Sequence, residues 1–298
     1  NARFGVKGGP VFVATGVDFA DALSIGPVVG ITGGTLFLVP GSSVSQGTLN
    51  AMKALSPSAV YIVGGKGAVS EAVASKVKSA TGKTPVRVAG KSRYQTSEEI
   101  YKKFFVETPR AVSTAFVATG RDFPDALSAA SAGAALSAPV LLVDGKAGKN
   151  LSAYSLSSLA EKGTSGVLIS GGKGAVSATI ETNLKKTFGT TGVKRLSGPN
   201  RYATNAAVNT YLNGEAVASS TALTSVWLAT GADFPDALSA AAPSGKLSSR
   251  LVLSNGSCIP KPVVSEWITK PGSKVSDVYL AGGKGVLRDS VYNLTQCK

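Results

Sequence analysis

The chain contains no histidine, a single methionine (Met52) and only two cysteines, and 7% of its residues are aromatic. Without histidine, the usual Ser-His, Cys-His and His-metal constellations are impossible, which excludes most hydrolase and zinc chemistry. The aromatic residues do not interleave with basic clusters, which argues against a stacking platform for single-stranded nucleic acid or a sugar-binding aromatic row. No apolar stretch reaches about 18 residues, so the sequence predicts no membrane span.

Acidic residues are also scarce: 17 Asp and Glu face 31 Lys and Arg, which gives a formal net charge of +14. The basic excess is spread along the chain and is not carried by a tail. A folded body with distributed positive charge attracts polyanions, such as nucleic acid, a teichoic-type polymer or an anionic surface. Plain solubility explains the same charge, so charge alone does not select a partner.

The chain contains an internal sequence repeat. The string A-T-G-x-D-F-[AP]-D-A-L-S occurs at residues 14–24, 118–128 and 229–239, with nine of eleven positions identical in all copies. Such recurrence indicates one structural unit used three times.

Further signals recur in constant order with this string. An aliphatic run follows each copy, and a G-G-K-G turn follows the next aliphatic run. The segment R-V-A-G-K-S-R-Y-Q-T at residues 87–96 is matched by R-L-S-G-P-N-R-Y-A-T at residues 195–204. A boundary just before this segment predicts three repeat units: residues 1–84, 85–191 and 192–298.

The first unit is short at its N-terminal end. Arg3 and Phe4 stand where the other units have Arg-Tyr, but only 12 residues separate Arg3 from the motif threonine, against 26 and 29 in the later units. We interpret the first unit as truncated, and a coincidental match of Arg3 is the alternative. Asn1 opens the chain without a methionine or a signal segment, as expected of a processed product.

Aliphatic runs of four to six residues alternate with longer periodic segments throughout the full units, which is typical of strands alternating with helices. Parallel strands need a crossover helix, and their sheets are covered on both faces. The sequence therefore predicts an α/β fold with parallel sheets, and the 43% apolar content suffices for three cores of about 100 residues each.

The repeated motif itself is interpreted as a strand-to-helix junction. Its first aspartate is placed to cap the following helix, and its second adds negative charge to the first helical turn. The six aspartates are Asp18, Asp21, Asp122, Asp125, Asp233 and Asp236. The alternative is a paired-carboxylate acid/base site, which needs two groups in unlike environments facing one cleft. We prefer capping because one enzyme rarely needs the same dyad three times.

Basic side chains near these junctions are candidate ligand contacts. Each glycine-rich turn presents backbone N–H groups and one lysine to an anion, namely Lys66, Lys173 or Lys284. The turn is neither a Walker A loop nor G-x-G-x-x-G, so we expect no nucleotide cofactor. The alternative is that its glycines only permit a tight, close-packed turn.

Arginines form a second group of candidate contacts. Arg93 and Arg201 each open a predicted helix, where they either pair with a motif aspartate or reach a phosphate or carboxylate of a ligand. Arg121, inside the second motif copy, and Arg250 are further basic candidates.

Cys258 and Cys297 both lie in the last unit, the first in a loop after an aliphatic run and the second at the end of the final predicted helix. A disulfide between them would tie down the C-terminal segment and implies an oxidising, extracellular location. Two free thiols in a cytosolic protein are the alternative.

Taken together, the D-F-P-D-A-L-S motif, the aliphatic strand after it, the G-G-K-G-A-V-S turn and the R-L-S-G-x-x-R-Y-A-T segment resemble the cell wall binding type 2 repeats of Gram-positive surface proteins. The resemblance covers essentially the whole chain. It implies three Toprim-like or Rossmann-like units in a pseudo-threefold arrangement. It further implies a secreted module that holds a surface protein non-covalently to an anionic wall polysaccharide or teichoic-like polymer, with an effector domain elsewhere.

The resemblance also implies ligand contacts at a proline-led aliphatic segment. Only the second unit keeps this form, at Pro139, Val140, Leu141 and Leu142. The corresponding segments are T-L-F-L in the first unit and R-L-V-L in the third. A buried core strand is the simplest interpretation of all three.

We therefore predict a non-catalytic wall-anchoring module that grips a repeating anionic ligand through basic clefts between repeats, with neither cofactor nor metal. Several weak sites on one polymer gain from high effective concentration. Two alternatives stay open: an extracellular hydrolase or phosphotransferase that uses the motif aspartates, and a nucleic-acid binder suggested only by the charge.

Overall fold

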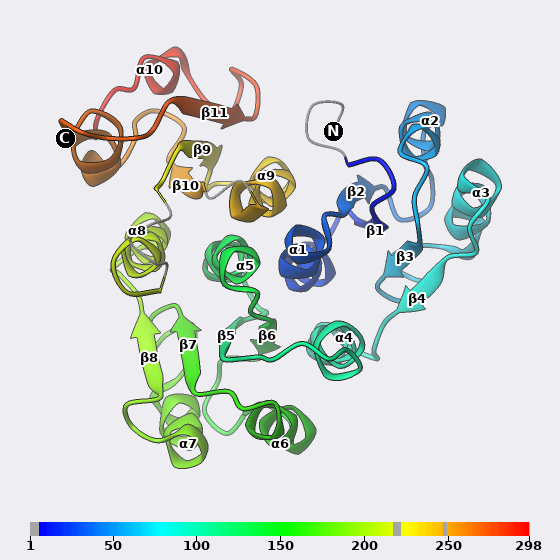
Figure 1. Cartoon of the computed structure of the whole chain (residues 1–298), viewed down its shortest axis with the longest axis horizontal. Helices are drawn as coiled ribbons and strands as arrows, with labels where there is room; N and C mark the ends of the chain where they lie inside the picture. The colour runs from blue at the N-terminus through cyan, green and yellow to red at the C-terminus, as the bar shows by residue number, and fades with distance from the viewer. Residues whose placement is uncertain (1–5, 217–221, 247–248, 298) are drawn as a thin grey trace.

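The computed structural model describes residues 6–216, 222–246 and 249–297. Within these ranges the chain forms three α/β units, each built on a parallel sheet, around three central helices (Figure 1). The predicted fold class is therefore confirmed. Arg3 and Phe4, on which the alignment of the short first unit depends, lie outside the described residues.

The first unit contains a four-stranded parallel sheet in the order β2-β1-β3-β4. Its strands are β1 (Val11–Thr15), β2 (Thr35–Val39), β3 (Val60–Val63) and β4 (Val86–Val88), and its helices are α1 (Ala20–Thr32), α2 (Gln46–Ala54) and α3 (Glu71–Thr81). All five residues of β1 are buried, as expected of a central strand covered on both faces. Ser45 and Ser70 cap α2 and α3 by accepting the backbone N–H three residues on.

The second unit repeats this order as β6-β5-β7-β8. Its strands are β5 (Thr114–Thr119), β6 (Val140–Val143), β7 (Gly166–Ser170) and β8 (Val193–Leu196), and its helices are α5 (Pro124–Leu136), α6 (Ala153–Glu161) and α7 (Ala178–Phe188). The equivalence of β5 with β1 and of β6 with β2 follows the repeated motif, which begins at the end of β1 and of β5.

The third unit is smaller, with the described strands in the order β10-β9-β11. Its elements are β9 (Ser225–Thr230), α9 (Pro235–Lys246), β10 (Arg250–Ser254), a π-helical turn η3 (Val263–Ile268), β11 (Asp277–Ala281) and α10 (Asp289–Tyr292). The four-residue α10 stands where α3 and α7 each have eleven residues.

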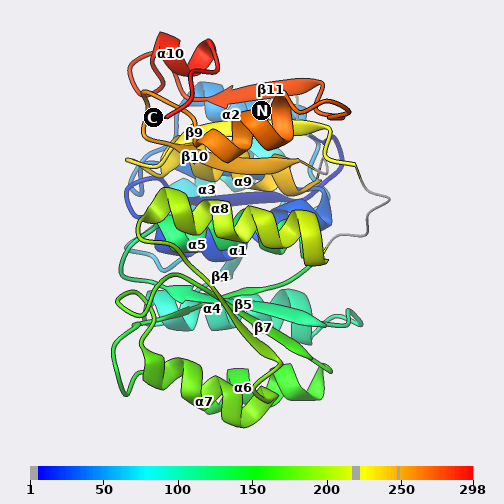
Figure 2. The ribbon, with the colours of Figure 1, turned by 90° about the vertical axis from the view of Figure 1, so that its left-hand side faces the viewer.

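Two linker helices join the units. Helix α4 (Arg93–Tyr101), with η1 (Lys102–Val106), leads from the first unit into the second, and α8 (Arg201–Tyr211), with η2 (Leu212–Ala216), leads from the second into the third. Helix α4 packs on α1 and β6, and α8 packs on α5 and β10 (Figures 1 and 2). Each linker helix thus fills the seam between two units.

The strand that precedes each linker helix belongs to the sheet of the earlier unit. Strand β4 pairs with β3, and β8 pairs with β7, all in parallel register. The sequence unit 85–191 therefore begins with a strand of the first sheet, and the unit 192–298 begins with a strand of the second. The first strand of the second and of the third sequence unit thus belongs to the sheet of the preceding unit. This shared strand links neighbouring units.

Helices α1, α5 and α9 pack against one another at the centre of the molecule (Figure 1). Their side chains are mostly small, and the hydroxyls of Ser131 in α5 and Ser244 in α9 are 2.8 Å apart in a buried hydrogen bond. At the N-terminal ends of these helices, the rings of Phe19, Phe123 and Phe234 form a triangle with centroids 5.9–6.0 Å apart. This triangle marks the pseudo-threefold axis. No helix within the described ranges combines the length and apolar character that a bilayer crossing requires.

Candidate functional site

A cavity of about 460 Å³ opens at the carboxyl ends of β5 and β7. Three segments line it: residues 119–125 of the repeated motif, residues 172–175 of the G-G-K-G turn and residues 198–204, which lead into α8. In open α/β sheets this edge, where neighbouring crossovers run in opposite directions, is the usual place for a ligand. The fold therefore brings three of the recurring sequence signals together at one candidate site.

Two basic side chains at this site are exposed enough to contact a ligand. Arg121 lines the cavity and is half exposed, with Nε 3.5 Å from Asp144 Oδ1. Lys173 lies in the turn between two lining glycines and forms no ion pair with any residue that the structure describes. Arg121 and Lys173 are thus the cations best placed to meet an anionic ligand.

The other two glycine-rich turns differ from this one. Lys66 Nζ is 3.6 Å from Glu71 Oε1 in the first unit, and Lys284 Nζ is 2.7 Å from Asp289 Oδ1 in the third. The second unit has Ala178 at the equivalent helix position. The three lysines, which the sequence treats as equivalent, therefore do not carry equivalent free charge.

Arg201 spans the seam between the second and third units. Its Nη1 donates to the Gly231 carbonyl at 2.7 Å, its Nη2 lies 3.6 Å from Asp122 Oδ2, and its guanidinium sits 5.3 Å from the centre of the Phe123 ring. These contacts join the motif of one unit to the motif of the next.

Arg93 does the same between the first and second units. Its Nη1 donates to the Gly120 carbonyl at 2.6 Å, its Nη2 donates to Asp18 Oδ2 at 2.9 Å, and its guanidinium lies 5.3 Å from the Phe19 ring centre. Both arginines are thus engaged in holding neighbouring units together, with about a third of each side chain exposed.

The motif aspartates act differently from the predicted caps. Phe19 and Phe123 occupy the cap positions of α1 and α5, without a side-chain hydrogen bond. Asp122 Oδ1 instead accepts the adjacent Phe123 N–H at 2.9 Å, and Asp18 Oδ1 accepts the Ala20 N–H at 3.3 Å. In the third unit, Asp233 Oδ1 accepts the adjacent backbone N–H at 2.8 Å. The first aspartates shape the turn before each helix, and two of them hold the seam arginines.

The second aspartates lie deeper, in the first turn of each central helix. Burial raises the pKa of the Asp125 carboxyl, and Asp122 raises it further, while the Thr204 hydrogen bond and Arg201 lower it. Burial likewise raises the pKa of Asp21, where Thr96 and Arg93 lower it. Asp122 and Asp125 thus occupy unlike environments, as an acid/base pair would, but each is already bound to a residue of α8. No three His, Cys, Asp or Glu residues gather as metal ligands in the part of the chain described.

The raised pKa of Asp125 predicts a pH-dependent stability effect. Because the folded state binds the carboxyl proton more tightly than the unfolded state, the stabilisation is fully present below the ordinary value of 3.8 and is lost as pH rises through the raised pKa. Wild type should therefore lose stability relative to the Asp125→Asn variant as the pH rises from about 3 through the raised pKa of Asp125. Denaturant unfolding of both proteins across this range measures the difference.

Glu181→Gln is the matched control with the opposite sign. The hydrogen bond from Lys185 lowers the pKa of Glu181, assisted by Arg195. Wild type should therefore gain stability relative to Glu181→Gln as pH rises over the same range. Parallel pH profiles for the two variants would contradict the opposite signs assigned to the two carboxyl groups.

The proline-led segment lies away from the site surface. Pro139 is buried before β6, and Val140, Leu141 and Leu142 are 1–3% exposed within that strand. These three side chains form part of the core. The core-strand interpretation therefore describes this segment.

Arg250 also lies away from the site. It begins β10, at the opposite edge of the sheet from the motif loops, and is only 4% exposed. Its Nε donates to Asn213 Oδ1 at 2.9 Å and its Nη1 to the Ser249 carbonyl at 3.0 Å, and burial lowers its pKa to about 10. The structure does not bring it together with Arg121 and Lys173.

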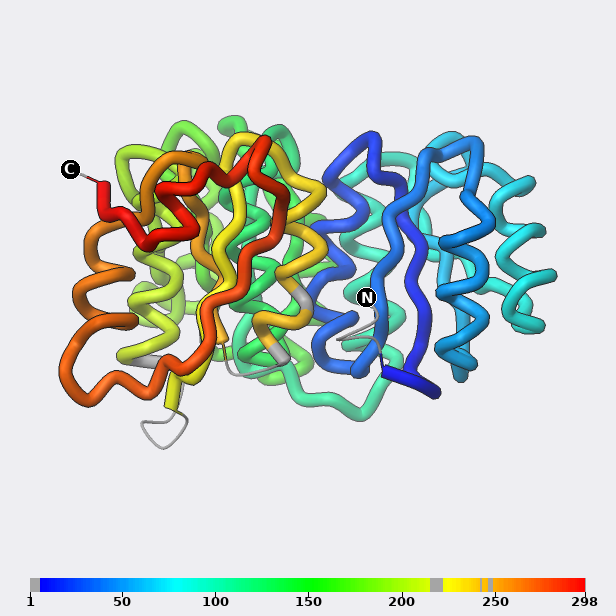
Figure 3. The backbone as a smooth tube through the Cα atoms, turned by 90° about the horizontal axis from the view of Figure 1, so that it is seen from above, coloured from blue at the N-terminus to red at the C-terminus, as the bar shows by residue number. Residues whose placement is uncertain are grey.

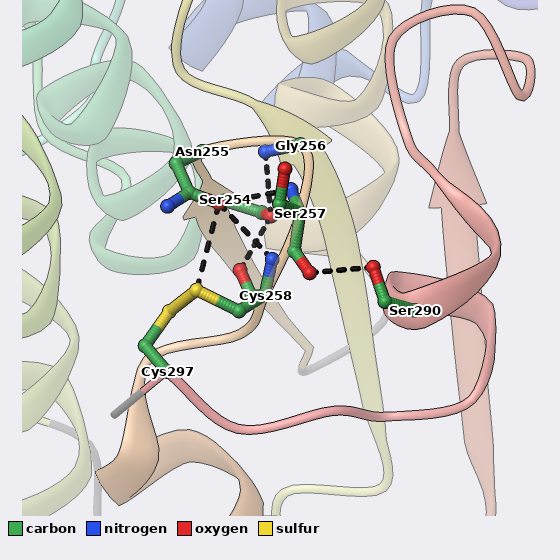
Figure 4. The surroundings of a disulfide bond; sticks show 7 residues. All are labelled: Ser254, Asn255, Gly256, Ser257, Cys258, Ser290 and Cys297. Atoms are coloured by element: carbon green, nitrogen blue, oxygen red, sulfur yellow. Dashed lines mark hydrogen bonds between the residues drawn. A yellow bond between two sulfur atoms is a disulfide. The ribbon is translucent and has the colours of Figure 1, made fainter.

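The predicted disulfide is present between Cys258 and Cys297, with Cα atoms 5.0 Å apart (Figure 4). It joins the loop after β10 to the C-terminal segment. Hydrogen bonds reinforce this link, because the Ile259 N–H donates to the Thr295 carbonyl at 2.8 Å and the Cys297 N–H donates to the Ile259 carbonyl at 2.9 Å.

Two further positions that contact a neighbouring unit cannot be recognised from the repeated motifs. Ser97 and Asn205 lie four residues after Arg93 and Arg201, at the same offset in each linker helix. Ser97 Oγ accepts the Leu142 N–H at 3.1 Å, and Asn205 Oδ1 accepts the Leu253 N–H at 3.1 Å. Each side chain thereby accepts a hydrogen bond from a backbone N–H group on the outer strand of a sheet. Their equal distance from the arginine of the linker helix could have pointed to a shared role, but the two residue types differ, so the sequence comparison does not reveal it.

The Cell wall binding domain 2 (CWB2) family matches three segments of the chain: residues 2–74, 87–181 and 195–292. Each segment contains one copy of the repeated motif.

Two relatives from Bacillus subtilis (strain 168) are each 28% identical to the chain. N-acetylmuramoyl-L-alanine amidase LytC matches over 244 residues, which are 82% of this chain and 45% of that protein. Amidase enhancer matches over 252 residues, 85% of this chain and 32% of that protein. The chain thus spans less than half the length of either relative.

Two cell wall proteins of known structure share the fold. Cwp8 from Clostridium difficile superposes with a TM-score of 0.81 at 25% identity, over 98% of this chain and 48% of that chain. Cwp6 from the same organism gives a TM-score of 0.80 at 21% identity, over 97% of this chain and 44% of that chain. With three tandem matches that cover most of its length, the chain belongs to the Cell wall binding domain 2 family.

Proposed function

We propose that the chain is a non-catalytic module that binds an anionic polymer of the cell wall, with the cavity beside Arg121 and Lys173 as a principal contact. Membership of a cell wall binding family supports the wall as the target and a location at the cell wall or surface. The observation that carries the proposal is the cavity at the carboxyl ends of β5 and β7. The half-exposed Arg121 lies beside it, together with Lys173, which forms no ion pair with any described residue.

The chemistry of the site favours holding an anion over transforming one. Asp122 is bound to Arg201, and Asp125 is hydrogen bonded to Thr204, so the two carboxylates contribute to the seam between units. The same arrangement recurs with Asp18 and Asp21 at the seam before it. We further propose that any effector domain lies elsewhere in the full-length protein, since the matched relatives extend well beyond the shared region.

Co-sedimentation with purified cell walls tests the proposal. Replacing both Arg121 and Lys173 by alanine should weaken binding by about tenfold, because two cations facing one anionic ligand each contribute on the order of 0.5–1 kcal/mol. Raising the salt concentration from about 0.05 M to about 0.5 M should weaken wild-type binding in the same direction, through screening of exposed charges.

The matched control removes the same charge from elsewhere. Lys186, in the last turn of α7, and Lys270, after η3, are exposed and lie away from the cavity. The Lys186→Ala, Lys270→Ala double variant should bind walls as wild type does, apart from the small effect of net charge. Equal losses in both double variants would show that only overall charge matters and would contradict a specific site.

Two rival outcomes also oppose the proposal. Turnover of wall fragments that disappears in a folded Asp122→Asn, Asp125→Asn variant would instead establish a hydrolase or phosphotransferase. Tight sequence-selective DNA binding that displaces the chain from walls at physiological salt would establish a nucleic-acid binder.

A further inference from the structure

The third unit has a pocket of its own at the amino ends of its strands. Figure 3 shows the orange segment from η3 to β11 passing the start of the yellow β9. A cavity of about 350 Å³ opens between these segments. We call it the η3 pocket, and its lining includes Asn213, Leu223, Glu266, Trp267, Lys270 and Lys274. It lies at the opposite edge of a sheet from the motif cavity, which opens at carboxyl ends.

Trp267 distinguishes this pocket from the same place in the other units. The turn η3 stands where the first two units have α2 and α6. Counted from the buried aliphatic residue before each of these segments, Trp267 corresponds to Met52 and Leu159. Both of those side chains are fully buried, whereas Trp267 is partly exposed and lines the pocket. A π-helical turn often marks a functional position, and here it presents an aromatic side chain that the other units lack.

The connection from Trp267 to β11 is also longer than its counterparts. Nine residues intervene, against seven and six in the first and second units. The connection contains the sequence K-P-G-S at residues 270–273, in which the Ser273 N–H donates to the Lys270 carbonyl at 2.9 Å and Gly272 has a φ of +81°. Proline at the second position and a left-handed glycine at the third are typical of a type II turn.

Hydrogen bonds attach this turn to both of its neighbours. The Ser273 hydroxyl donates to the Trp267 carbonyl and accepts the Val275 N–H at 3.1 Å. The backbone of Lys270 and Lys274, on either side of the turn, is thereby held in a fixed position relative to Trp267. Two departures from the repeat, the tryptophan and the longer turn, therefore form one structure.

The charged groups of the pocket are unpaired. Lys270 and Lys274 are exposed and, like Glu266, form no ion pair with any residue that the structure describes. Two lysines at one depression raise the local concentration of an anion. The pocket is therefore suited to a ligand that carries negative charge.

Asn213 adds a hydrogen-bond donor of defined orientation. Its Oδ1 accepts from Arg250 Nε at 2.9 Å. Because a guanidinium only donates, this bond assigns the amide oxygen to the Arg250 side and leaves the Nδ2 group without a partner in the described ranges. Arg250 is 4% exposed and pairs with no carboxylate among the described residues, so its charge adds to the positive potential behind Asn213.

We propose that the η3 pocket binds a free sugar that carries one anionic group, a carboxylate or a phosphate. The apolar face of the sugar ring packs on the Trp267 indole, and the anionic group lies between Lys270 and Lys274. Sugar hydroxyls accept from Asn213 Nδ2 and donate to the Glu266 carboxylate.

This class of ligand uses each group that lines the pocket. A bare anion leaves the apolar surface of Trp267 and Leu223 in water, and a neutral sugar leaves the lysines unpaired. The volume suits one ring and not a row of them. The inference is independent of the proposed function, because the pocket lies at the other edge of the sheets from Arg121 and Lys173.

NMR of the tryptophan indole N–H groups in the full chain measures the binding. The chain has two tryptophans, so Trp267→Phe identifies the Trp267 signal, and Trp227, which is 6% exposed, is the internal control. Titration with glucuronic acid or glucose 6-phosphate should shift the Trp267 signal saturably, with a Kd of about 1 mM or lower. Glucose and inorganic phosphate, which each lack one half of the ligand, should bind at least about tenfold more weakly. The tighter acidic sugar identifies the anionic group.

Substitutions separate the contribution of the ring from that of the charge. The Lys270→Ala, Lys274→Ala variant should bind the acidic sugars at least about tenfold more weakly and leave the weak binding of glucose unchanged. Ligand-observed NMR should show a larger loss for Trp267→Ala than for Trp267→Phe, which keeps an aromatic face. The matched control, Lys186→Ala with Lys261→Ala, removes the same charge from exposed positions outside the pocket and should bind as wild type does.

Three results would overturn the inference. The first is no shift of the Trp267 signal with up to about 10 mM of either acidic sugar. The second is binding of glucose or inorganic phosphate as tight as that of the acidic sugars. The third is an equal loss in the two double lysine variants. Wall binding is a separate outcome: Trp267→Phe should leave co-sedimentation unchanged, and the Arg121→Ala, Lys173→Ala variant should leave the sugar titration unchanged.

Discussion

Replacing Gly171 by alanine should lower the free energy of unfolding of the second unit by about 3 kcal/mol. Gly171 has a φ of +116°, a conformation that residues with a Cβ atom rarely adopt. A Cβ atom there would lie 2.3 Å from Asp125 Oδ2 and 3.1 Å from the Ala175 Cβ. Asp125 cannot withdraw without losing its hydrogen bond to Thr204 of α8. The substitution therefore combines backbone strain with damage to the seam.

The backbone of Gly171 is also held in place on both sides. Its N–H donates to the Leu196 carbonyl at 2.9 Å, and its carbonyl accepts a 2.7 Å hydrogen bond from Arg195 Nη1. Relaxation of the turn would break one of these bonds, so the alanine cannot be accommodated cheaply.

Two glycines of the same turn provide the matched controls. A Cβ atom on Gly172 or Gly174 would meet no atom within 4 Å, and neither has a positive φ. Alanine at either position should change the free energy of unfolding by less than about 0.5 kcal/mol. Denaturant unfolding, followed by hydrogen exchange in β7 and α8, measures all three variants. A loss at Gly171 no greater than at Gly172 would show that the turn and Asp125 rearrange freely.

The first glycine of this turn is thus explained by packing against the motif aspartate. The same contact recurs in the first unit, where a Cβ atom on Gly64 would lie 2.2 Å from Asp21 Oδ2, and in the third, where the distance from Gly282 to Asp236 Oδ2 would be 2.9 Å. Two motifs that are about 40 residues apart in sequence are therefore one packing unit. The close-packed-turn interpretation accounts for this first glycine, while the later glycines and Lys173 face outward.

The sequence is sufficient to predict the elements of the fold, because the three aligned copies place strand, helix and turn signals at the same offsets. It does not predict the offset between repeats and sheets. Whether the short strand at 86–88 joins the sheet before it or after it depends on the path of α4, and the path is set by packing on α1 and β6. No local pattern of residues contains that information.

The candidate site was predictable in part for a similar reason. The pairing of a seam arginine with a motif aspartate was one of two alternatives, since the partner of Arg93 lies 75 residues away and only the fold brings it near. Whether the lysine of each glycine-rich turn forms an ion pair depends on a single helix position, which is occupied by Glu71, Ala178 or Asp289. Arg250 was singled out by its charge, whereas its place at the amino end of a buried strand, which leaves it 4% exposed, depends on the fold.

Removing the disulfide should destabilise the third unit by about 3–4 kcal/mol. Cys258 and Cys297 close a loop with a sequence separation of 39, and opening such a loop raises the conformational entropy of the unfolded state. The third unit has little else to hold its C-terminal segment, since α10 spans four residues and the described sheet has three strands. The Cys258→Ser, Cys297→Ser variant should therefore lose the ordered C-terminal segment first.

Native-state hydrogen exchange at the Ile259 N–H, which donates to the Thr295 carbonyl, reports this local opening. The chain has no other cysteine, so reductant acts on wild type at this bond alone. Reduced wild type and the double variant should show the same accelerated exchange, and reductant should not alter the double variant. Exchange in β1 of the first unit is the internal control and should stay slow. If the Ile259 N–H stayed equally protected in the double variant, the hydrogen bonds to residues 295–297 and the packing of α10 would suffice without the covalent link.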